Sequence, residues 1–292
     1  MSPKSKHAAA WGVACGAGSA LCWALGFVAA RQGVTTGLSP LVIAMHRFVW
    51  SGLVFLPVLA ADGFADFRGV RLRRGITLAF FGGLPLALFS YLGYVLVPLG
   101  HGALIQPACA ALGGLLLAWL VLKEPLPLRR IVGATAMLAG LLVIGAEALR
   151  TIGRSGVGGD LLFVAAGSFF AVFGMLLRLW LVPPLRAVAV TSVLSVAGLP
   201  MLFWTFDNMV AAGFYENLMQ AIVQGGLAGA GAIYLFTRAV ELLGVARAAL
   251  FPSLVPPFTL LIGYFALGEV PSISQLIGLV IVVLGFQLTQ KG

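Results

Sequence analysis

Residues 103–125 read ALIQPACAALGGLLLAWLVLKEP, and residues 248–270 read AALFPSLVPPFTLLIGYFALGEV. Each stretch has a proline at its fifth position and a glutamate at its twenty-second, and the run between them is apolar and uncharged until its end. A helix that crosses the hydrocarbon core of a membrane needs about 20 predominantly apolar residues. The two stretches therefore predict a membrane protein whose halves are related to each other.

The composition of the whole chain agrees with this prediction. Of its 292 residues, 61% are hydrophobic and only 9% are charged, and the mean hydropathy is +1.06. Soluble domains carry about 25% charged residues, and a soluble fold so poor in charge would expose large apolar patches. Ten spans would use about 200 residues, which leaves no room for a separate catalytic domain.

We predict an all-α integral membrane fold with ten transmembrane helices, because strands with open edges leave backbone groups unpaired in hydrocarbon. The expected spans cover residues 8–30, 39–61, 75–97, 101–122, 127–147, 158–179, 184–205, 217–238, 245–267 and 271–289.

The basic residues predict the orientation of these spans. With ten spans both termini lie on one side, and that side collects 14 of the 18 Lys and Arg residues: Lys4, Lys6, Arg68, Arg71, Arg73, Arg74, Lys123, Arg129, Arg130, Arg178, Arg186, Arg238, Arg247 and Lys291. The positive-inside rule then predicts a multi-pass protein of the cell inner (plasma) membrane with both termini cytoplasmic. No basic stripe with interleaved aromatic residues occurs, so nucleic acid is not an expected partner, whereas membrane lipids are.

The match between the two quoted stretches continues in both directions. At an offset of 145, Gly133 matches Gly278 and Gly140 matches Gly285, while upstream Tyr91 matches Tyr234 at an offset of 143. Each half holds five spans, an odd number, so the second copy must enter the membrane from the opposite side. We predict a first repeat over 1–147 and an inverted second repeat over 148–292, an arrangement typical of secondary transporters with a substrate site between the halves.

The residues that carry this repeat also carry a family resemblance. The pattern Ala103, Pro107, Leu122-Lys123-Glu124-Pro125, Gly133 and Gly140, with its echo Ala248, Pro252, Leu267-Gly268-Glu269, Gly278 and Gly285, resembles the twin EamA-type repeats of the drug/metabolite transporter superfamily. Within it, the chain most resembles the bacterial exporters of aromatic amino acids. The resemblance covers nearly the whole chain and implies a central cavity lined mainly by spans 1, 3, 4, 6, 8 and 9, with the other spans as scaffold.

The acidic residues bear on energy coupling. All nine acids are expected at span ends or in loops, and Asp160 is assigned to the connection 153–160. Proton-driven pumps usually have an ionisable residue inside the membrane. This pattern disfavours a proton-coupled antiporter for cations and leaves a facilitator, or coupling through a less obvious group.

Three kinds of residue are singled out for structural roles. Glu124 and Glu269 each precede a helix, where a carboxylate can cap free N–H groups, and a gating role is the alternative. Pro107 and Pro252 are expected to kink their spans and free backbone carbonyls. Arg47 lies within a span, and it either packs or forms a salt link as part of the scaffold or contacts an anionic substrate group.

Deep aromatic and polar side chains supply the substrate-site prediction. Buried Tyr and Trp need partners for their polar atoms, which a wet cavity supplies, and their rings favour aromatic or other apolar substrates and can hold an ammonium. The predicted substrate-binding residues are Trp23, Tyr91, Tyr94, Gln106, Phe170, Tyr234 and Ser253.

Together these features predict a secondary transporter, not an enzyme, that exports aromatic and other neutral amino acids by alternating access. The alternatives are a multidrug or other metabolite carrier of the same fold, or an intramembrane lipid-modifying enzyme that uses Arg71-Arg73-Arg74 or Arg129-Arg130. No cofactor and no metal site are expected, because the three histidines lie on different segments and no phosphate-binding loop between a strand and a helix is present.

Overall fold

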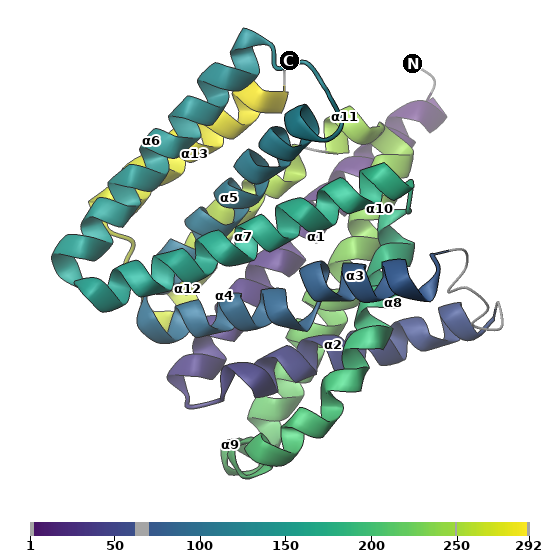
Figure 1. Ribbon diagram of the computed structural model, residues 1–292, viewed down its shortest axis with the longest axis vertical. Helices are drawn as coiled ribbons and strands as arrows, with labels where there is room; N and C mark the ends of the chain where they lie inside the picture. Colours follow the sequence, from purple (N-terminus) through teal and green to yellow (C-terminus); the bar gives the residue numbers. More distant parts are fainter. Residues whose placement is uncertain (1–2, 62–69, 249, 291–292) are drawn as a thin grey trace.

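The computed structural model of the chain describes residues 3–61, 70–248 and 250–290, and every regular element in these ranges is a helix (Figure 1). Asp62, Asp66, Arg68 and Lys291 lie outside the described residues, as do the side chains of Lys4 and Lys6. The helices are α1 (Pro3–Thr35), α2 (Pro40–Ala60), α3 (Leu72–Gly82), α4 (Leu84–Leu96), α5 (Leu99–Leu120), α6 (Leu128–Thr151), α7 (Arg154–Trp180), α8 (Pro184–Ser195), η2 (Val196–Thr205), α9 (Phe206–Gln220), η3 (Ala221–Gly231), α10 (Ala232–Leu243), α11 (Val245–Ala248), η4 (Phe251–Leu254), α12 (Val255–Leu267) and α13 (Ile273–Gln290).

Several of these helices are long and apolar enough to cross a membrane, which confirms the all-helical membrane class. Among the described residues there are seven such stretches: Ala9–Thr35, Pro40–Pro57, Leu72–Leu96, Leu99–Leu120, Arg154–Trp180, Pro184–Met201 and Phe203–Leu243. Two shorter apolar stretches follow, Phe251–Leu267 and Ile273–Thr289.

Some of the predicted spans are interrupted helices. The expected span 75–97 breaks between α3 and α4 at Gly83, where a Cβ would lie 2.2 Å from the carbonyl oxygen of Ala79. The expected span 245–267 breaks around Pro252, which lies in the 3-10 turn η4, whereas α5 continues through Pro107. Proline therefore interrupts one copy of the repeated stretch more strongly than the other.

Helices α6 and α13 pack side by side along one edge of the molecule (Figure 1). Their contact is made by the four repeated glycines: a Cβ on Gly133 would lie 2.5 Å from the carbonyl oxygen of Gly285, and one on Gly278 would lie 3.2 Å from that of Gly140. Small residues allow this close backbone approach. The 145-residue offset relates Gly133 to Gly278 and Gly140 to Gly285, so each of the two contacts is the repeat equivalent of the other. The helix pair therefore has an internal two-fold relation.

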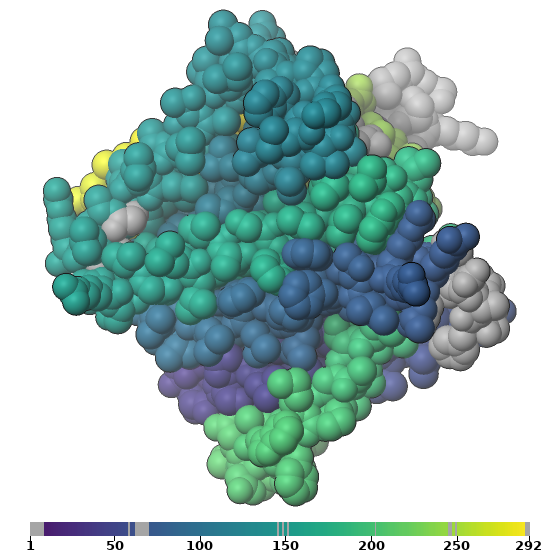
Figure 2. Space-filling model, in the orientation of Figure 1, coloured from purple at the N-terminus to yellow at the C-terminus, as the bar shows by residue number. Residues whose placement is uncertain are grey.

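Helices from the two halves of the chain are interleaved in the rest of the fold. α7 packs against α4 and α5, and α1 packs in a related way against α10 and α12. In the space-filling view, α7 crosses the visible face directly against the first-half helices α3 and α4 (Figure 2). Both ends of the chain lie toward the upper side of Figure 1, and the turn from α6 to α7 lies at the left edge.

Candidate functional site

The centre of the helix interface holds a fully buried amide, Gln224, on the π-helix η3. Its Nε2 donates to the carbonyl oxygen of Gly26 at 2.8 Å, and its Oε1 accepts from the Tyr91 hydroxyl at 3.0 Å. The Arg47 guanidinium lies 3.5 Å from the same Oε1. The side chain thus joins α1, α2 and α4 to η3, and π-helical turns are frequent at functional sites.

A second buried amide, Gln220, lies one turn before Gln224. Its Nε2 donates to the carbonyl oxygen of Ala29 at 2.8 Å and to a Glu216 carboxylate oxygen at 3.0 Å. The other Glu216 oxygen accepts from Gln32 at 2.9 Å. This polar row between α1 and α9 was not predicted, since Gln220 and Glu216 carry no repeat match and only their helical spacing links them.

A neighbouring hydrogen-bonded chain holds α2 against α9. The Trp50 Nε1 donates to His46 Nδ1 at 3.0 Å, and His46 Nε2 lies 2.9 Å from the Asn217 side-chain oxygen. Asn217 in turn donates to the carbonyl oxygens of Met209 and Gly213 at 2.7 Å each. These contacts place His46 in a scaffold between neutral partners.

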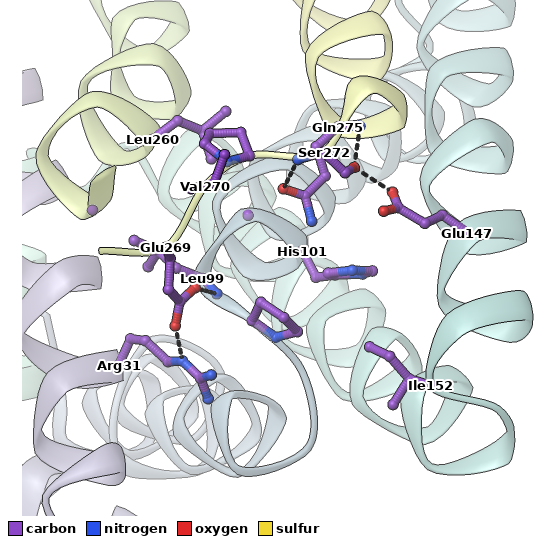
Figure 3. A pocket seen from close by; sticks show the side chains of 14 residues that line it. Arg31, Leu99, His101, Glu147, Ile152, Leu260, Glu269, Val270, Ser272 and Gln275 are labelled. Carbon is purple, nitrogen blue, oxygen red and sulfur yellow. Dashed lines mark hydrogen bonds and ion pairs between the residues drawn. The ribbon is translucent and has the colours of Figure 1, made fainter. Parts of the chain in front are cut away.

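A pocket of about 470 Å³ opens at the end of the molecule where α1, α4, α6 and α12 end (Figure 3). Its wall carries the ion pair between Arg31 Nε and Glu269 Oε1, at 2.6 Å. Glu269 Oε2 also accepts the backbone N–H of Leu99 at 2.8 Å, and Arg31 donates to the carbonyl oxygen of Tyr94. Glu269 therefore satisfies the first N–H of α5, a different helix from the one that follows it.

The helix that follows Glu269 has its own cap. Ser272 Oγ accepts the backbone N–H of Gln275 at 3.0 Å, while Gln275 Oε1 accepts the backbone N–H of Ser272 at 3.4 Å. This reciprocal pair is a capping box, and Ser272 also donates to Glu147 at 2.7 Å. The capping sequence Ser-x-x-Gln was visible in the chain and was overlooked.

The repeat partner of Glu269 forms a similar ion pair at the other end of the molecule. Glu124 pairs with Arg178 at the end of α7 and lies 3.9 Å from Arg130 Nη1. Arg178 follows Arg31 by 147 residues, close to the 145-residue offset that relates the two glutamates. Lys123 and Gly268, each just before its glutamate, also share a positive φ, of 58° and 68°. No hydrogen bond from Glu124 to the start of α6 is present among the described residues.

The predicted aromatic residues fall into buried and exposed sets. Tyr91 and Tyr94 are buried, and Trp23 lies on α1 with its ring 5.7 Å from that of Phe236. Phe170 and Tyr234 are 48% and 56% exposed. The structure therefore brings Tyr91 into the central hydrogen-bonded cluster and leaves its repeat partner Tyr234 at an open surface.

The remaining predicted polar residues form local bonds. Gln106 Oε1 accepts from Ser90 Oγ at 2.9 Å, which links α5 to α4. Ser253 is buried and donates to the carbonyl oxygen of Leu250 at 2.6 Å. None of the seven predicted substrate-binding residues lines the pocket at the end of the molecule.

One buried ionisable pair corrects the assignment of Asp160 to a connection between spans. Asp160 lies inside α7, is 8% exposed, and is 2.9 Å from Nδ1 of His101, which is 1% exposed. The expected loop 153–160 does not exist, because α7 already begins at Arg154. This pair could not be predicted from the sequence, because its members are 59 positions apart and meet only where α5 packs on α7.

Comparison with known proteins agrees with the helical architecture. The family model of the EamA-like transporter family matches the chain twice, over residues 10–146 and 157–289. An uncharacterized transporter of Archaeoglobus fulgidus is 25% identical over 92% of this chain and 95% of its own length. The uncharacterized transporter YyaM of Bacillus subtilis is 27% identical over 66% of this chain and 64% of its own length.

A solved structure shares the fold. It is described only as the crystal structure of a protein, and it superimposes with a TM-score of 0.63 at 22% identity, covering 95% of this chain and 96% of the other. The two family matches together span most of the chain, and the relatives are transporters by name. The protein is therefore a multi-pass membrane protein that belongs to the EamA-like transporter family.

Proposed function

We propose that this transporter exports aromatic and other neutral amino acids across the cell inner membrane by alternating access. In this proposal ten spans form two inverted five-helix repeats, 1–147 and 148–292, and both termini are cytoplasmic. The central cluster around Gln224 and Tyr91 then lies between the repeats, where inverted-repeat transporters bind their substrates.

The observation that carries the proposal is the pair of related ion pairs at opposite ends of the molecule. Arg31–Glu269 joins the end of α1 to the α12–α13 connection, and Arg178–Glu124 joins the end of α7 to the α5–α6 connection. An inverted repeat requires that the same contact recur on the other face. The two pairs differ in exposure: the Arg31 and Glu269 side chains are 18% and 25% exposed, those of Arg178 and Glu124 54% and 33%.

This difference supports a closure that alternates between the two faces. In the described state, the Arg31 pair is reinforced by bonds to Tyr94 and Leu99 and is partly withdrawn from solvent. A more exposed ion pair contributes little to stability, since water competes for both charges. The Arg31–Glu269 pair is thus the more firmly held of the two contacts, although the pocket opens beside it. In the opposite state the two ion pairs would exchange these environments.

The substrate class is supported by the chemistry of the side chains near the centre. Trp23 and Phe236 offer ring faces, while the partly buried Gln106 offers an amide group that can bind a carboxylate or an ammonium. Phe170 and Tyr234 are large aromatic side chains with open surface. A zwitterion with an apolar side chain fits this combination of rings and neutral hydrogen-bonding groups.

Flux through reconstituted protein tests this function. Liposomes that contain the full chain and are loaded with radiolabelled phenylalanine should release it faster than protein-free liposomes, and unlabelled neutral amino acids should compete. Gln106→Leu should lower this rate by about tenfold, the effect of losing about 1.4 kcal/mol of substrate binding. Thr135→Val, at an exposed hydroxyl on α6, is the matched control and should leave the rate unchanged. Release equal to that of empty liposomes for every amino acid would refute the substrate class.

A further inference from the structure

We propose that His101 and Asp160 form a proton-binding site that couples transport to the proton gradient. The inference rests on the proposed transport function and names the ion that drives it. The side chains of His101 and Asp160 are only 2% and 12% exposed, and His101 Nδ1 lies 2.9 Å from Asp160 Oδ1. Asp160 Oδ2 is buried without a hydrogen-bond partner in the described parts of the chain, so the carboxylate is incompletely satisfied.

The site is connected to solvent by the pocket at the end of the molecule. His101 is one of the pocket-lining residues, and Figure 3 shows it on the side that faces Glu147 and Ile152. Its Nε2 has no hydrogen-bond partner among the described residues. A proton can therefore reach the imidazole from the pocket, while Asp160 lies behind it on α7, one turn before the fully buried Phe163.

The net charge of the pair gives the coupling its direction. With a proton bound, imidazolium and carboxylate sum to zero, and such a pair can stay buried. Without that proton a neutral imidazole donates to a bare carboxylate, and a net charge of −1 remains in an apolar interface, which is costly unless water enters. Proton loading should thus stabilise the closed pocket and proton loss should favour its hydration.

Neighbouring elements contribute further ionisable groups. On the pocket wall, Arg31 from α1 is paired with Glu269, and Glu147 from α6 accepts from Ser272. Other ionisable groups on the packed helices lie outside this wall: Tyr91 and Tyr94 of α4, Arg73 and Arg74 of α3, Arg129, Arg130 and Arg150 of α6, Arg154 and Arg178 of α7, Tyr264 of α12, Cys15 and Cys22 of α1 and Cys109 of α5. The His101–Asp160 pair is the most deeply buried of the ion pairs in the described residues.

Proton balance follows from alternating access. One proton binds to the pair from the pocket face, the pocket closes on the neutral pair, and the same proton leaves when the α5–α7 interface opens to the opposite face. No bond other than the N–H bond of the imidazole is made or broken. Each cycle then moves one proton inward while the substrate moves outward.

The first test reads the pocket directly and needs no substrate. Ile152→Cys is placed in full-length protein whose native cysteines, Cys15, Cys22 and Cys109, are replaced by alanine. The maleimide labelling rate is divided at each pH by that of a Leu181→Cys reporter, which is 88% exposed and lies outside the pocket, to remove the pH dependence of the thiol itself. Histidine side chains change charge between about pH 5 and 8. The corrected rate should rise about tenfold over this range.

Variants separate proton binding from a purely structural bond. Asp160→Asn and His101→Gln keep a hydrogen bond but lose the titrating pair, and each should reduce the pH effect to less than about twofold. His46→Gln is the matched control, because His46 is also buried but its hydrogen bonds go only to the neutral Asn217 and Trp50, and it should keep the full effect. The proposal would be overturned if the corrected labelling rate did not change with pH while His101 and Asp160 are both present. It would also be overturned if Asp160→Asn left the pH dependence of that rate unchanged.

The second test measures coupling in liposomes with phenylalanine. When the liposome interior is more acidic than the medium, uptake of labelled phenylalanine should be about tenfold faster than when the pH is equal on both sides. Asp160→Asn should abolish this acceleration, while exchange of phenylalanine for phenylalanine continues. Exchange without any effect of the gradient would overturn the coupling but leave the transporter function intact. If no amino acid is exchanged at all, the proposed substrate class is wrong. The pH dependence of the labelling rate still decides whether the His101–Asp160 pair binds a proton that controls access to the pocket.

Discussion

At the scale of single residues, the central interaction is the hydrogen bond between Tyr91 and Gln224. Both side chains are buried, and the bond joins α4 to η3 across the interface of the two halves. Tyr91→Phe should lower the free energy of unfolding by about 1 kcal/mol, because the Gln224 oxygen loses a donor. Thermal unfolding of the purified protein measures this loss.

The repeat provides the matched control for this substitution. Tyr234 is the sequence equivalent of Tyr91, but it is 56% exposed and donates no hydrogen bond to a described residue. Tyr234→Phe should change stability by less than about 0.5 kcal/mol. Equal effects of the two substitutions would contradict the assignment of Tyr91 to a buried polar cluster.

The two repeated glutamates should also differ in their contribution to stability. Glu269 accepts from Arg31 and from the backbone of Leu99, so Glu269→Gln weakens two charge-assisted bonds and should cost about 1.5–3 kcal/mol. Glu124→Gln removes a more exposed pair and should cost at most about 1 kcal/mol. Urea unfolding of the two variants in the same detergent compares them, and a larger loss in Glu124→Gln would contradict the described state.

At this scale the repeat in the sequence draws attention to Tyr91 and Glu269, and both make long-range contacts. Glu269 caps α5 instead of the helix that follows it, and substrate binding by Tyr91 stays a prediction. Asp160 and His101 were missed because hydropathy assigns a residue to a segment but does not say which segments touch. The same reason explains why Gln220 and Glu216 were overlooked.

At the scale of helices, the close approach of α6 and α13 depends on glycine. A Cβ on Gly133 would lie 2.5 Å from the Gly285 carbonyl oxygen and 2.8 Å from Thr289 Cγ2. Gly133→Ala should therefore push the helices apart and lower stability by about 1–3 kcal/mol. Unfolding measured by the loss of helical circular dichroism tests this value.

Gly114 is the control for this glycine substitution, since it also lies within a helix but a Cβ there would meet no atom within 4 Å. Gly114→Ala should be neutral or stabilising by up to about 1 kcal/mol, because alanine favours helix more than glycine does. If Gly133→Ala were equally harmless, the α6–α13 contact would not be as close as described.

Helix boundaries were only partly predictable. Apolar length located most segments but passed over the break at Gly83, although Gly82, Gly83 and Pro85 in the first turn of α4 are local helix breakers, so apolar length alone is a limited guide to helix ends. The kink prolines illustrate the same limit. Pro107 lies in a continuous helix and Pro252 in a 3-10 turn, although their sequence surroundings match.

At the scale of the whole molecule, the internal repeat organises both the packing and the proposed mechanism. The glycine contacts of α6 and α13 exchange under the repeat, as do the Arg31–Glu269 and Arg178–Glu124 ion pairs. These relations follow from a duplication that the sequence displays. The exposure difference between the two ion pairs could not be predicted from it, because two halves with matching motifs still occupy different conformations in any one state.

The measurement that tests this account most directly is the sidedness of two equivalent connections. Pro125→Cys and Val270→Cys occupy matching positions, each directly after its repeated glutamate, and both are exposed. A membrane-impermeant maleimide applied to right-side-out and inside-out vesicles should label Val270→Cys from the outside and Pro125→Cys from the inside. Labelling of both cysteines from the same compartment would contradict the inverted repeat.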